Sequence, residues 1–396
     1  MSLDRAAVDR TVDEIGERLI ELSRKIHAHP ELSFEEHRAS AWISELVESV
    51  GRVTVERGVG GLPTAFRARS GGKAAPRLAV LAEYDALPDI GHACGHNLIA
   101  GAAVGAFLAL ARYGNELGGS IELVGTPAEE GGGGKIKLIE AGAFEGVDAA
   151  MMFHPFDRDV LAHPALATHR LRARFKGAPA HAAFAPWNGR SALTACMDTF
   201  KLVDSQRVHF RDGVRVYGIV TNGGQAPNII VEDAALEYTL RAPTSGGLAA
   251  VVATVERCTR AAALASDVEV SIEHEVGYHE MLNNLTIAQR FGTALEALGR
   301  TPRMTDTSIG AASTDMGDVS LAIPAIHPWL GICNEGETLC HQHAFAACAA
   351  SPRGFDTMLI AAKAMARTAL DLFDAPALIE AAHAEHRAAR AHSIHG

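Results

Sequence analysis

The feature that most constrains the fold is an alternation of short apolar runs with longer helical segments in the first 165 residues. Runs at 78–81, 121–124 and 149–153 have the length and composition of buried strands. An Ala- and Gly-rich helix is expected at 98–112. Strands that alternate with helices predict an α/β domain with a mainly parallel sheet and helices on both faces.

Two helices are expected ahead of these strands, between residues 8 and 50. Apolar residues recur at spacings of three and four from Val12 to Ile26, which predicts the first helix, and Pro30 follows its end. Ser33 stands three positions before Glu36, which is a capping-box pattern. The sequence therefore predicts Ser33 as the N-cap of the second helix.

The pattern changes between residues 166 and 280. Four strands and two helices are expected there as two strand–helix–strand halves: strands at 167–175, 214–220, 235–241 and 268–274, and helices near 189–207 and 246–264. This arrangement predicts an inserted α+β domain of the ferredoxin-like kind at 166–280. The first domain is then split into 1–165 and 281–396, and a helix at 355–373 is expected to close the chain.

Composition and charge limit the classes of function that the chain can have. The chain has 36 basic and 47 acidic residues and a net charge of −11, which argues against a nucleic-acid partner. Its longest apolar stretch, 100–111, is shorter than the roughly 20 residues of a membrane-spanning helix. The charged N-terminal segment does not resemble a secretory signal. With six scattered cysteines, these features predict a cytoplasmic protein with reduced thiols.

Two segments carry metal-ligating side chains close together. Residues 91–97 read Gly-His-Ala-Cys-Gly-His-Asn and place Cys94 and His96 two positions apart between glycines. A thiolate and an imidazole both suit a borderline metal such as Zn²⁺. The other segment, 126–135, places Glu129 and Glu130 before four glycines. An incidental buried cysteine and an exposed acidic turn are the alternative interpretations of these two segments.

Two further elements supply histidines. His154 follows the apolar run at 149–153, and residues 340–343 read Cys-His-Gln-His, so either His341 or His343 could complete a site. Ligands of open α/β sheets gather at the carboxyl ends of the strands. The four elements together therefore predict a metal site, although each alone is a weak signal.

These motifs resemble those of the peptidase family M20 amidohydrolases. The matching segments are His-Pro-Glu-Leu at 29–32, Asp-Ala-Leu-Pro at 85–88, the segment 92–97 and Pro-Ala-Glu-Glu-Gly-Gly-Gly-Gly at 127–134. The branch they resemble includes aminobenzoyl-glutamate hydrolases, N-acyl-amino-acid and indoleacetyl-amino-acid hydrolases and aminoacylase-1-like dipeptidases. The resemblance runs in order along nearly the whole chain.

The resemblance implies a centre with two divalent metal ions. A thiolate ligand favours Zn²⁺, whereas carboxylate and imidazole ligands also accept Mn²⁺. Cys94 would bridge the two ions, and the remaining ligands would be His96, Glu130, His154 and His341. The choice of His341 follows the family's His-x-x-x-Phe pattern, which residues 341–345 match, although the neighbouring His343 departs from the family.

The resemblance also assigns roles outside the ligand set. Glu129 would be the general base, and Asp85 an acidic residue near the metals that does not bind them directly. The inserted domain would be a lid and dimerisation domain. Its His181, in the segment 177–182, would stabilise the oxyanion, acting across the interface of a homodimer.

Two further lid residues would bind a small amide substrate. Asn228, in the segment 223–230, would hydrogen-bond the scissile amide, and Arg241 would bind a substrate carboxylate. A turn histidine at position 181 and a solvent-facing arginine at position 241 are the alternatives. The expected reaction is therefore hydrolysis of an N-acyl amino acid, an aminobenzoyl amino acid or a dipeptide.

Two other functions remain open from the sequence. The same centre could deaminate an aromatic amine, which would need no carboxylate-binding Arg241. The chain could also be a non-catalytic binding protein, but a general base such as Glu129 beside a metal ligand argues against that role.

Overall fold

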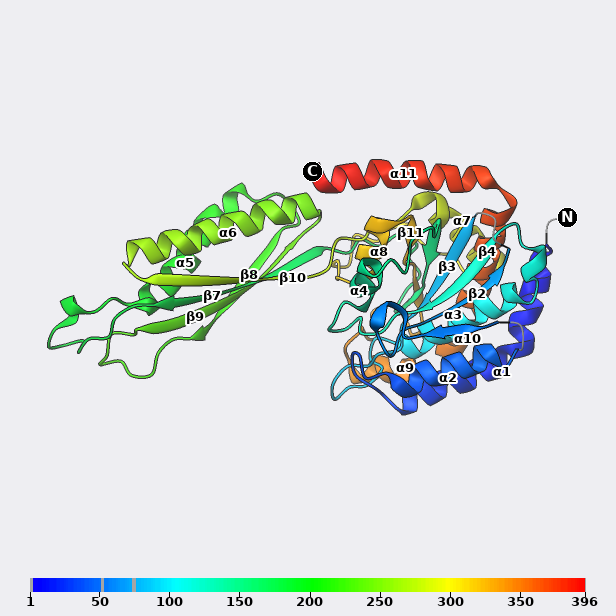
Figure 1. The fold of residues 1–396 in the computed structure, drawn as a ribbon, viewed down its shortest axis with the longest axis horizontal. Coiled ribbons are helices and arrows are strands. Elements are labelled where there is room, and N and C mark those ends of the chain that lie inside the picture. Colours follow the sequence, from blue (N-terminus) through cyan, green and yellow to red (C-terminus); the bar gives the residue numbers. More distant parts are fainter. Residues whose placement is uncertain (1–2, 51–52, 73–75, 396) are drawn as a thin grey trace. The chain divides into compact units, whose positions relative to one another are not determined.

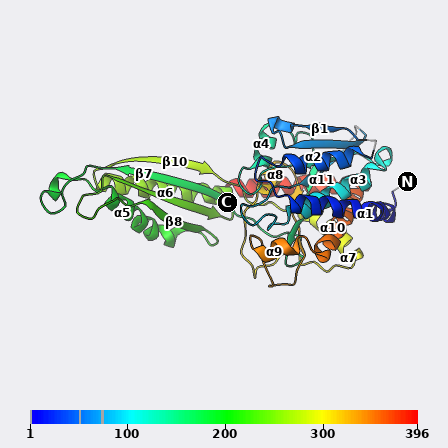
Figure 2. The same ribbon diagram turned by 90° about the horizontal axis from the view of Figure 1, so that it is seen from below.

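The computed structural model describes residues 3–50, 53–72 and 76–395, which form two compact units (Figures 1 and 2). Unit 1 comprises Met1–Pro164 and Met281–Arg390, and unit 2 comprises Ala165–Glu280 and Ala391–Gly396. Each unit has its own sheet and its own core.

The sheet of unit 1 is mixed and mainly parallel. Its order is β1-β2-β4-β3-β5-β11, with parallel pairing of β4 with β3, β3 with β5 and β5 with β11. Only the pairings of β1 with β2 and β2 with β4 are antiparallel in this sheet. The bounds are β1 Val55–Arg57, β2 Phe66–Gly71, β3 Arg77–Ala82, β4 Ser120–Gly125, β5 Ala149–Met151 and β11 Ala325–Ile326. The predicted α/β class with a mainly parallel sheet is confirmed.

Helix α3 (His96–Ala111) is buried along its whole length and packs on β3 and β4, while α1 (Arg5–Ala28) and α10 (Pro352–Asp374) pack on α3. A Cβ atom at Gly105 would lie 2.8 Å from Cδ1 of Leu19 in α1 and 2.9 Å from Cβ of Ala362 in α10, so glycine permits the close approach of the three helices. Further α-helices of this unit are α2 His37–Glu48, α4 Gly134–Glu140, α7 Leu285–Ala297, α8 Met316–Ala322 and α9 His343–Cys348.

The prediction of Ser33 as a helix N-cap is wrong. Helix α2 begins at His37, and Glu36 is its N-cap residue. The Ser33 hydroxyl instead donates a hydrogen bond to Oδ2 of Asp85. The buried Glu36 carboxylate accepts hydrogen bonds from the backbone amides of Phe34 and Ala128, both at 2.9 Å. Tertiary hydrogen bonds thus replace the expected capping box.

Two other elements differ from expectation. The strand expected at 149–153 ends at Met151, and His154 begins β6 (His154–Phe156), which pairs in parallel with β12 (Trp329–Gly331) in a separate two-stranded sheet. The helix expected to close the chain is followed by α11 (Pro376–His395), so that prediction is wrong. Figure 1 shows α11 on one side of the main sheet and α3 and α10 on the other.

Unit 2 has the predicted ferredoxin-like order of elements. Two strand–helix–strand halves form an antiparallel sheet with the order β10-β7-β9-β8. The bounds are β7 Ala167–Lys176, α5 Ala192–Gln206, β8 Arg215–Asn222, β9 Asp233–Ala242, α6 Ser245–Ala265 and β10 Glu269–Val276. Both helices pack on β7 and β9 around a core that includes Phe175, Leu240 and Val255.

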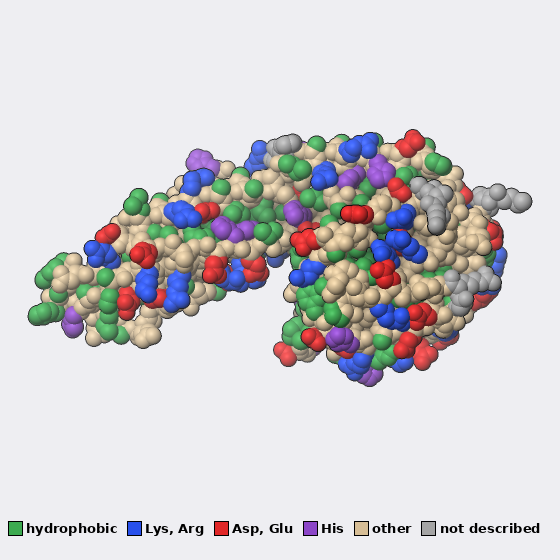
Figure 3. Space-filling model, viewed as in Figure 1, with side chains coloured by type: hydrophobic (Ala, Val, Ile, Leu, Met, Phe, Trp, Pro, Cys, Tyr) green, Lys and Arg blue, Asp and Glu red, His purple; other side chains and the backbone are tan. Residues whose placement is uncertain are grey.

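The sheet of unit 2 also carries cross-strand ion pairs. Arg170 on β7 contacts Glu275 on β10, and Arg172 contacts Glu237 on β9. Basic and acidic side chains are interspersed over the visible face of this unit (Figure 3). Of the helices in the described ranges, none is both long and apolar enough to cross a membrane.

Candidate metal centre

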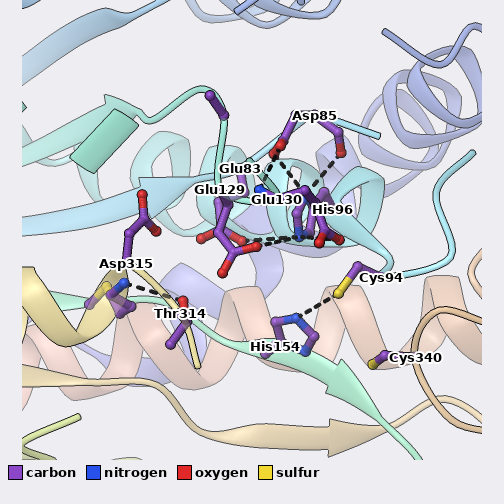
Figure 4. Close-up of polar contacts among 12 residues, drawn as sticks. Glu83, Asp85, Cys94, His96, Glu129, Glu130, His154, Thr314, Asp315 and Cys340 are labelled. Carbon is purple, nitrogen blue, oxygen red and sulfur yellow. Dashed lines mark hydrogen bonds and ion pairs between the residues drawn. The ribbon is translucent and has the colours of Figure 1, made fainter. Parts of the chain in front are cut away.

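Side chains from five segments of unit 1 converge beyond the ends of β3 and β4. They come from the segment after β3, the start of α3, the loop after β4, the start of β6 and the loop before α9. Figure 4 shows this group, with the carboxylates of Glu129 and Glu130 facing His96, and Cys94 lying between His96 and His154. Helices and strand ends therefore position most of the site.

Cys94 and His96 meet because the chain turns sharply between them. Gly95 has a φ of +79°, and a Cβ atom there would lie 2.8 Å from Cγ of Pro155. The backbone thus requires glycine at this position. His96 is completely buried, and its Nδ1 lies 3.0 Å from Oδ1 of Asp85 and 2.9 Å from the Asp85 carbonyl oxygen. With Nδ1–H donating to these oxygens, the lone pair of Nε2 points into the centre.

His154 is oriented in the same way. Its Nδ1 lies 2.7 Å from the carbonyl oxygen of Pro155, and its Nε2 lies 3.4 Å from Sγ of Cys94. Burial lowers the pKa of His154 to about 4. The ring is therefore neutral near pH 7, which is the form that binds a metal.

The two adjacent glutamates occupy different positions. Ala128 has a φ of +59°, and the backbone amide of Glu130 donates a hydrogen bond to Oδ2 of Asp85 at 2.9 Å. Oε2 of Glu129 and Oε1 of Glu130 each lie 4.0 Å from Nε2 of His96. Burial raises the pKa of Glu129 well above its ordinary value, with Glu83 and Glu130 adding to the effect.

His341, rather than His343, reaches the other predicted ligands. Its Nε2 lies 3.4 Å from Oε2 of Glu130 and 3.8 Å from Sγ of Cys94. The hydrogen bond with Glu130 raises the pKa of His341. His341 has a φ of +67°, an uncommon conformation for a residue with a side chain. Within the described ranges, His343 belongs to no group of potential metal ligands.

The donor set fits divalent metal ions. Three overlapping groups, each with all donor atoms within 4.8 Å of one another, are Cys94–His96–His154, Cys94–Glu130–His341 and His96–Glu129–Glu130. Among the described residues, Nε2 of His96 and Oε1 of Glu130 are buried without a hydrogen-bond partner. Because the groups share Cys94, His96 and Glu130, the five predicted ligands could hold two neighbouring ions.

The structure adds three residues that the sequence did not place in a role. Glu83, Lys135 and Asp315 are completely buried beside Glu129. Lysine is almost never fully buried unless it is paired, so composition alone does not predict this position. The sequence signal that could have drawn attention to Lys135 is its position directly after the four glycines at 131–134. A side chain at this position lies either toward the metal centre or toward solvent.

The predicted lid residues His181 and Asn228 lie together in unit 2. The backbone amide of Ala182 donates to the carbonyl oxygen of Asn228 at 3.0 Å, and His181 bridges to Ile229. The His181 side chain is exposed, and its Nδ1 accepts hydrogen bonds from the backbone amides of Ala183 and Phe184. This fixes the ring and leaves Nε2 as the nitrogen that can act on a ligand.

Arg241 lies elsewhere in unit 2. It stands at the end of β9, paired with Thr168 of β7 and Arg215 of β8, whereas Asn228 precedes the start of β9 at Asp233. From Asp233 to Arg241 the strand advances eight residues, which corresponds to roughly 26 Å. The structure therefore places Arg241 far from Asn228 within one copy of the unit.

Comparison with known families bears on this centre. The model of peptidase family M20/M25/M40 matches residues 79–371. The chain belongs to this family. The match includes every residue of the donor set and the 165–280 segment of unit 2.

Two relatives of this chain are named as a dipeptidase and as a subunit of a hydrolase. The M20 chain is 39% identical to a mouse (Mus musculus) protein named Xaa-Arg dipeptidase, over 97% of this chain and 92% of that protein. It is 29% identical to one component of the p-aminobenzoyl-glutamate hydrolase of Escherichia coli (strain K12), over 96% of this chain and 94% of that protein. The M20 chain is accordingly a metal-dependent peptidase or amidohydrolase.

The fold also matches a solved M20 structure. The Bacillus subtilis YXEP protein, described as a dinuclear metal binding peptidase, superposes with a TM-score of 0.72 at 21% identity, over 91% of this chain and 99% of that one. At this identity the likeness supports the fold alone.

Proposed function

We propose that the protein is a dinuclear-metal amidohydrolase that cleaves the amide bond of small dipeptides, N-acyl amino acids or aminobenzoyl amino acids. Cys94, His96, Glu130, His154 and His341 would hold the two ions. The observation that carries the proposal is the convergence of these five donors with Glu129 directly beside them. A binding protein would have no use for a buried carboxylate in that position.

Two divalent ions bound there would lower the pKa of a bound water and polarise the amide carbonyl of the substrate. Glu129 takes the proton from the attacking water and delivers it to the leaving nitrogen. Asp85 holds the His96 ring in orientation through Nδ1.

His181 and Asn228 donate hydrogen bonds to the developing oxyanion, and Arg241 binds the substrate carboxylate. A small substrate cannot span the roughly 26 Å that separates the ends of β9. Two copies of the chain are therefore needed if all three residues act on one substrate. This supports a homodimer formed through unit 2.

The edge strand β8 of unit 2 suits such a dimer. The side chains of Tyr217 and Ile219 on this strand are 49% and 63% exposed. An edge strand with exposed apolar side chains and open backbone groups readily pairs with another chain.

The substrate class follows from the relatives and from Arg241. A guanidinium binds a carboxylate in a bidentate manner, so the leaving half is an amino acid with a free carboxyl group. Dipeptides with a C-terminal arginine are the first candidates because of the relative named Xaa-Arg dipeptidase. A thiolate ligand favours Zn²⁺, while the carboxylate and imidazole ligands also accept Mn²⁺. The six free thiols fit a reducing, cytoplasmic environment.

The test is metal content measured together with amine release. Protein as purified, after chelation, and after refilling with Mn²⁺ or Zn²⁺ is assayed on Xaa-Arg dipeptides, aminobenzoyl-glutamate and N-acyl amino acids. We expect two ions per chain and cleavage that depends on them. Absence of bound ions and of activity after refilling would overturn the proposal. Ammonia released from aromatic amines, without amide cleavage, would replace it with a deaminase.

A further inference from the structure

A lysine ammonium lies fully buried beside the proposed metal centre. Nζ of Lys135 is 2.6 Å from Oδ1 of Asp315 and also hydrogen-bonds Oε1 of Glu83. The backbone amide of Lys135 donates to the other oxygen of Asp315 at 3.1 Å. All three side chains are completely buried. Burial alone would lower the pKa of Lys135, but the attraction of Asp315 and Glu83 outweighs it and raises that pKa, so the ammonium is charged.

The carboxylates around this ammonium are spaced like metal ligands. Oxygen atoms of Glu83, Glu129 and Asp315 lie within 4.8 Å of one another. Three carboxylates that are ionised and buried together would be strongly destabilising without positive charge nearby. A covalently attached ammonium supplies that charge here.

This carboxylate cluster adjoins the metal centre at two points. Glu129 belongs both to the cluster and to the donor group His96–Glu129–Glu130. Oε2 of Glu83 lies 3.4 Å from Nε2 of His96. A divalent ion in the cluster would therefore take Glu129 as a ligand and compete with the neighbouring ions for His96.

We infer that Lys135 is a built-in cation that excludes divalent ions from the Glu83–Glu129–Asp315 cluster and so keeps Glu129 outside the ligand set. The inference rests on the proposed role of Glu129 as the base. Lys135 touches neither substrate nor metal in this scheme and is a positioning residue. A lysine that only joins the start of α4 to Asp315 would stabilise the fold without affecting the number of bound ions.

The decisive experiment counts ions in Lys135→Met, which keeps the length of the side chain and removes its charge. Wild type and variant are loaded with Mn²⁺, freed of excess ion and measured by elemental analysis and native mass spectrometry. We expect the variant to hold one more ion per chain than wild type and to lose activity. Lys137→Met, which removes an exposed lysine from the same helix, should match wild type in both.

Equal ion counts in folded Lys135→Met and in wild type would overturn the inference. The double variant Lys135→Met/Asp315→Asn removes one oxygen ligand of the new site, and its count should return to the wild-type number. A count that stays raised would place the additional ion elsewhere and would also overturn the inference. Wild type without ions would contradict the proposed function, whereas the difference of one ion between the proteins tests Lys135 separately.

A variant that fails to fold in the absence of metal is also informative. Thermal unfolding of Lys135→Met is then followed against Mn²⁺ concentration. A divalent ion in place of the ammonium should restore folding, with a midpoint that rises with Mn²⁺ more steeply than that of Lys137→Met. Failure to fold at any Mn²⁺ concentration would show that Lys135 is only a structural tether.

Discussion

Nε2 of His341 lies 3.4 Å from Oε2 of Glu130, although the two residues are separated in the sequence by the whole 165–280 segment of unit 2. His343, two positions further along, has an exposed side chain outside the described donor groups. We therefore expect His341→Ala to weaken the binding of at least one ion and His343→Ala to leave binding unchanged. Competition with a chromophoric chelator measures both affinities. A larger loss in His343→Ala would reverse the ligand assignment.

Glu129→Gln should separate metal binding from catalysis. The amide keeps the size of the side chain but cannot take a proton from water, so kcat should fall by about 10²–10⁴-fold. The ion count should stay that of wild type, because Glu129 is proposed to lie outside the ligand set. Steady-state kinetics on a dipeptide and metal analysis of the same sample check both statements. A variant with wild-type kcat would remove Glu129 from the mechanism.

Folding stability should decrease as the pH falls below about 6.5. His386 is buried on α11, and Nε2 lies 2.8 Å from the carbonyl oxygen of Ser320. Burial lowers the pKa of His386 in the folded state, whereas the unfolded chain has a value near 6.5. Between these two values the unfolded state binds more protons, so stability is present above pH 6.5 and is lost as the pH falls.

His386→Gln tests this contribution, because glutamine keeps an N–H donor for Ser320 and does not titrate. Urea unfolding of the metal-free protein between pH 7 and pH 5 should show a shallower loss of free energy in this variant than in wild type. His209→Gln, at an exposed position, should keep the wild-type slope. An unchanged slope in His386→Gln would mean that the group titrates alike in both states.

Ile219→Asp should separate the proposed dimer into monomers and reduce activity together with it. The substitution places a charge in the middle of β8, where the Ile219 side chain is 63% exposed. Sedimentation velocity and kcat/KM are measured on the same preparation. Val276→Asp, on the opposite edge strand β10, controls for a charge at an exposed apolar position. A monomeric Ile219→Asp protein with full activity would show that one copy supplies the complete site.

The sequence predicted the sheet better than it predicted the loops. Strands β3 and β4 are buried on both faces, and such strands appear as uninterrupted apolar runs. Ser33 is not an N-cap because the next residue, Phe34, has a φ of +66° and cannot begin a helix, and a capping pattern does not reveal this backbone conformation. Local signals identify elements, whereas tertiary hydrogen bonds decide their ends.

The candidate site shows the same limit. The spacing of the motif predicted Cys94 and His96 as ligands. The turn at Gly95 explains how two residues only two positions apart can face the same centre. The family's His-x-x-x-Phe pattern favoured His341 over His343, but it did not reveal the left-handed backbone conformation at His341. The role of Lys135 was beyond sequence reasoning, since its two carboxylate partners lie just after β3 and just before α8.

The interruption of unit 1 by unit 2 has a consequence for biosynthesis. Strand β5 pairs with β11 through Ala150 and Ala325, and His341 follows later still. A nascent chain that has emerged only as far as unit 2 has made Cys94, His96, Glu130 and His154 but lacks both the edge strand and the last histidine. The complete donor set therefore forms only after nearly the whole polypeptide has left the ribosome, and a product truncated before residue 341 would lack one of the five predicted ligands.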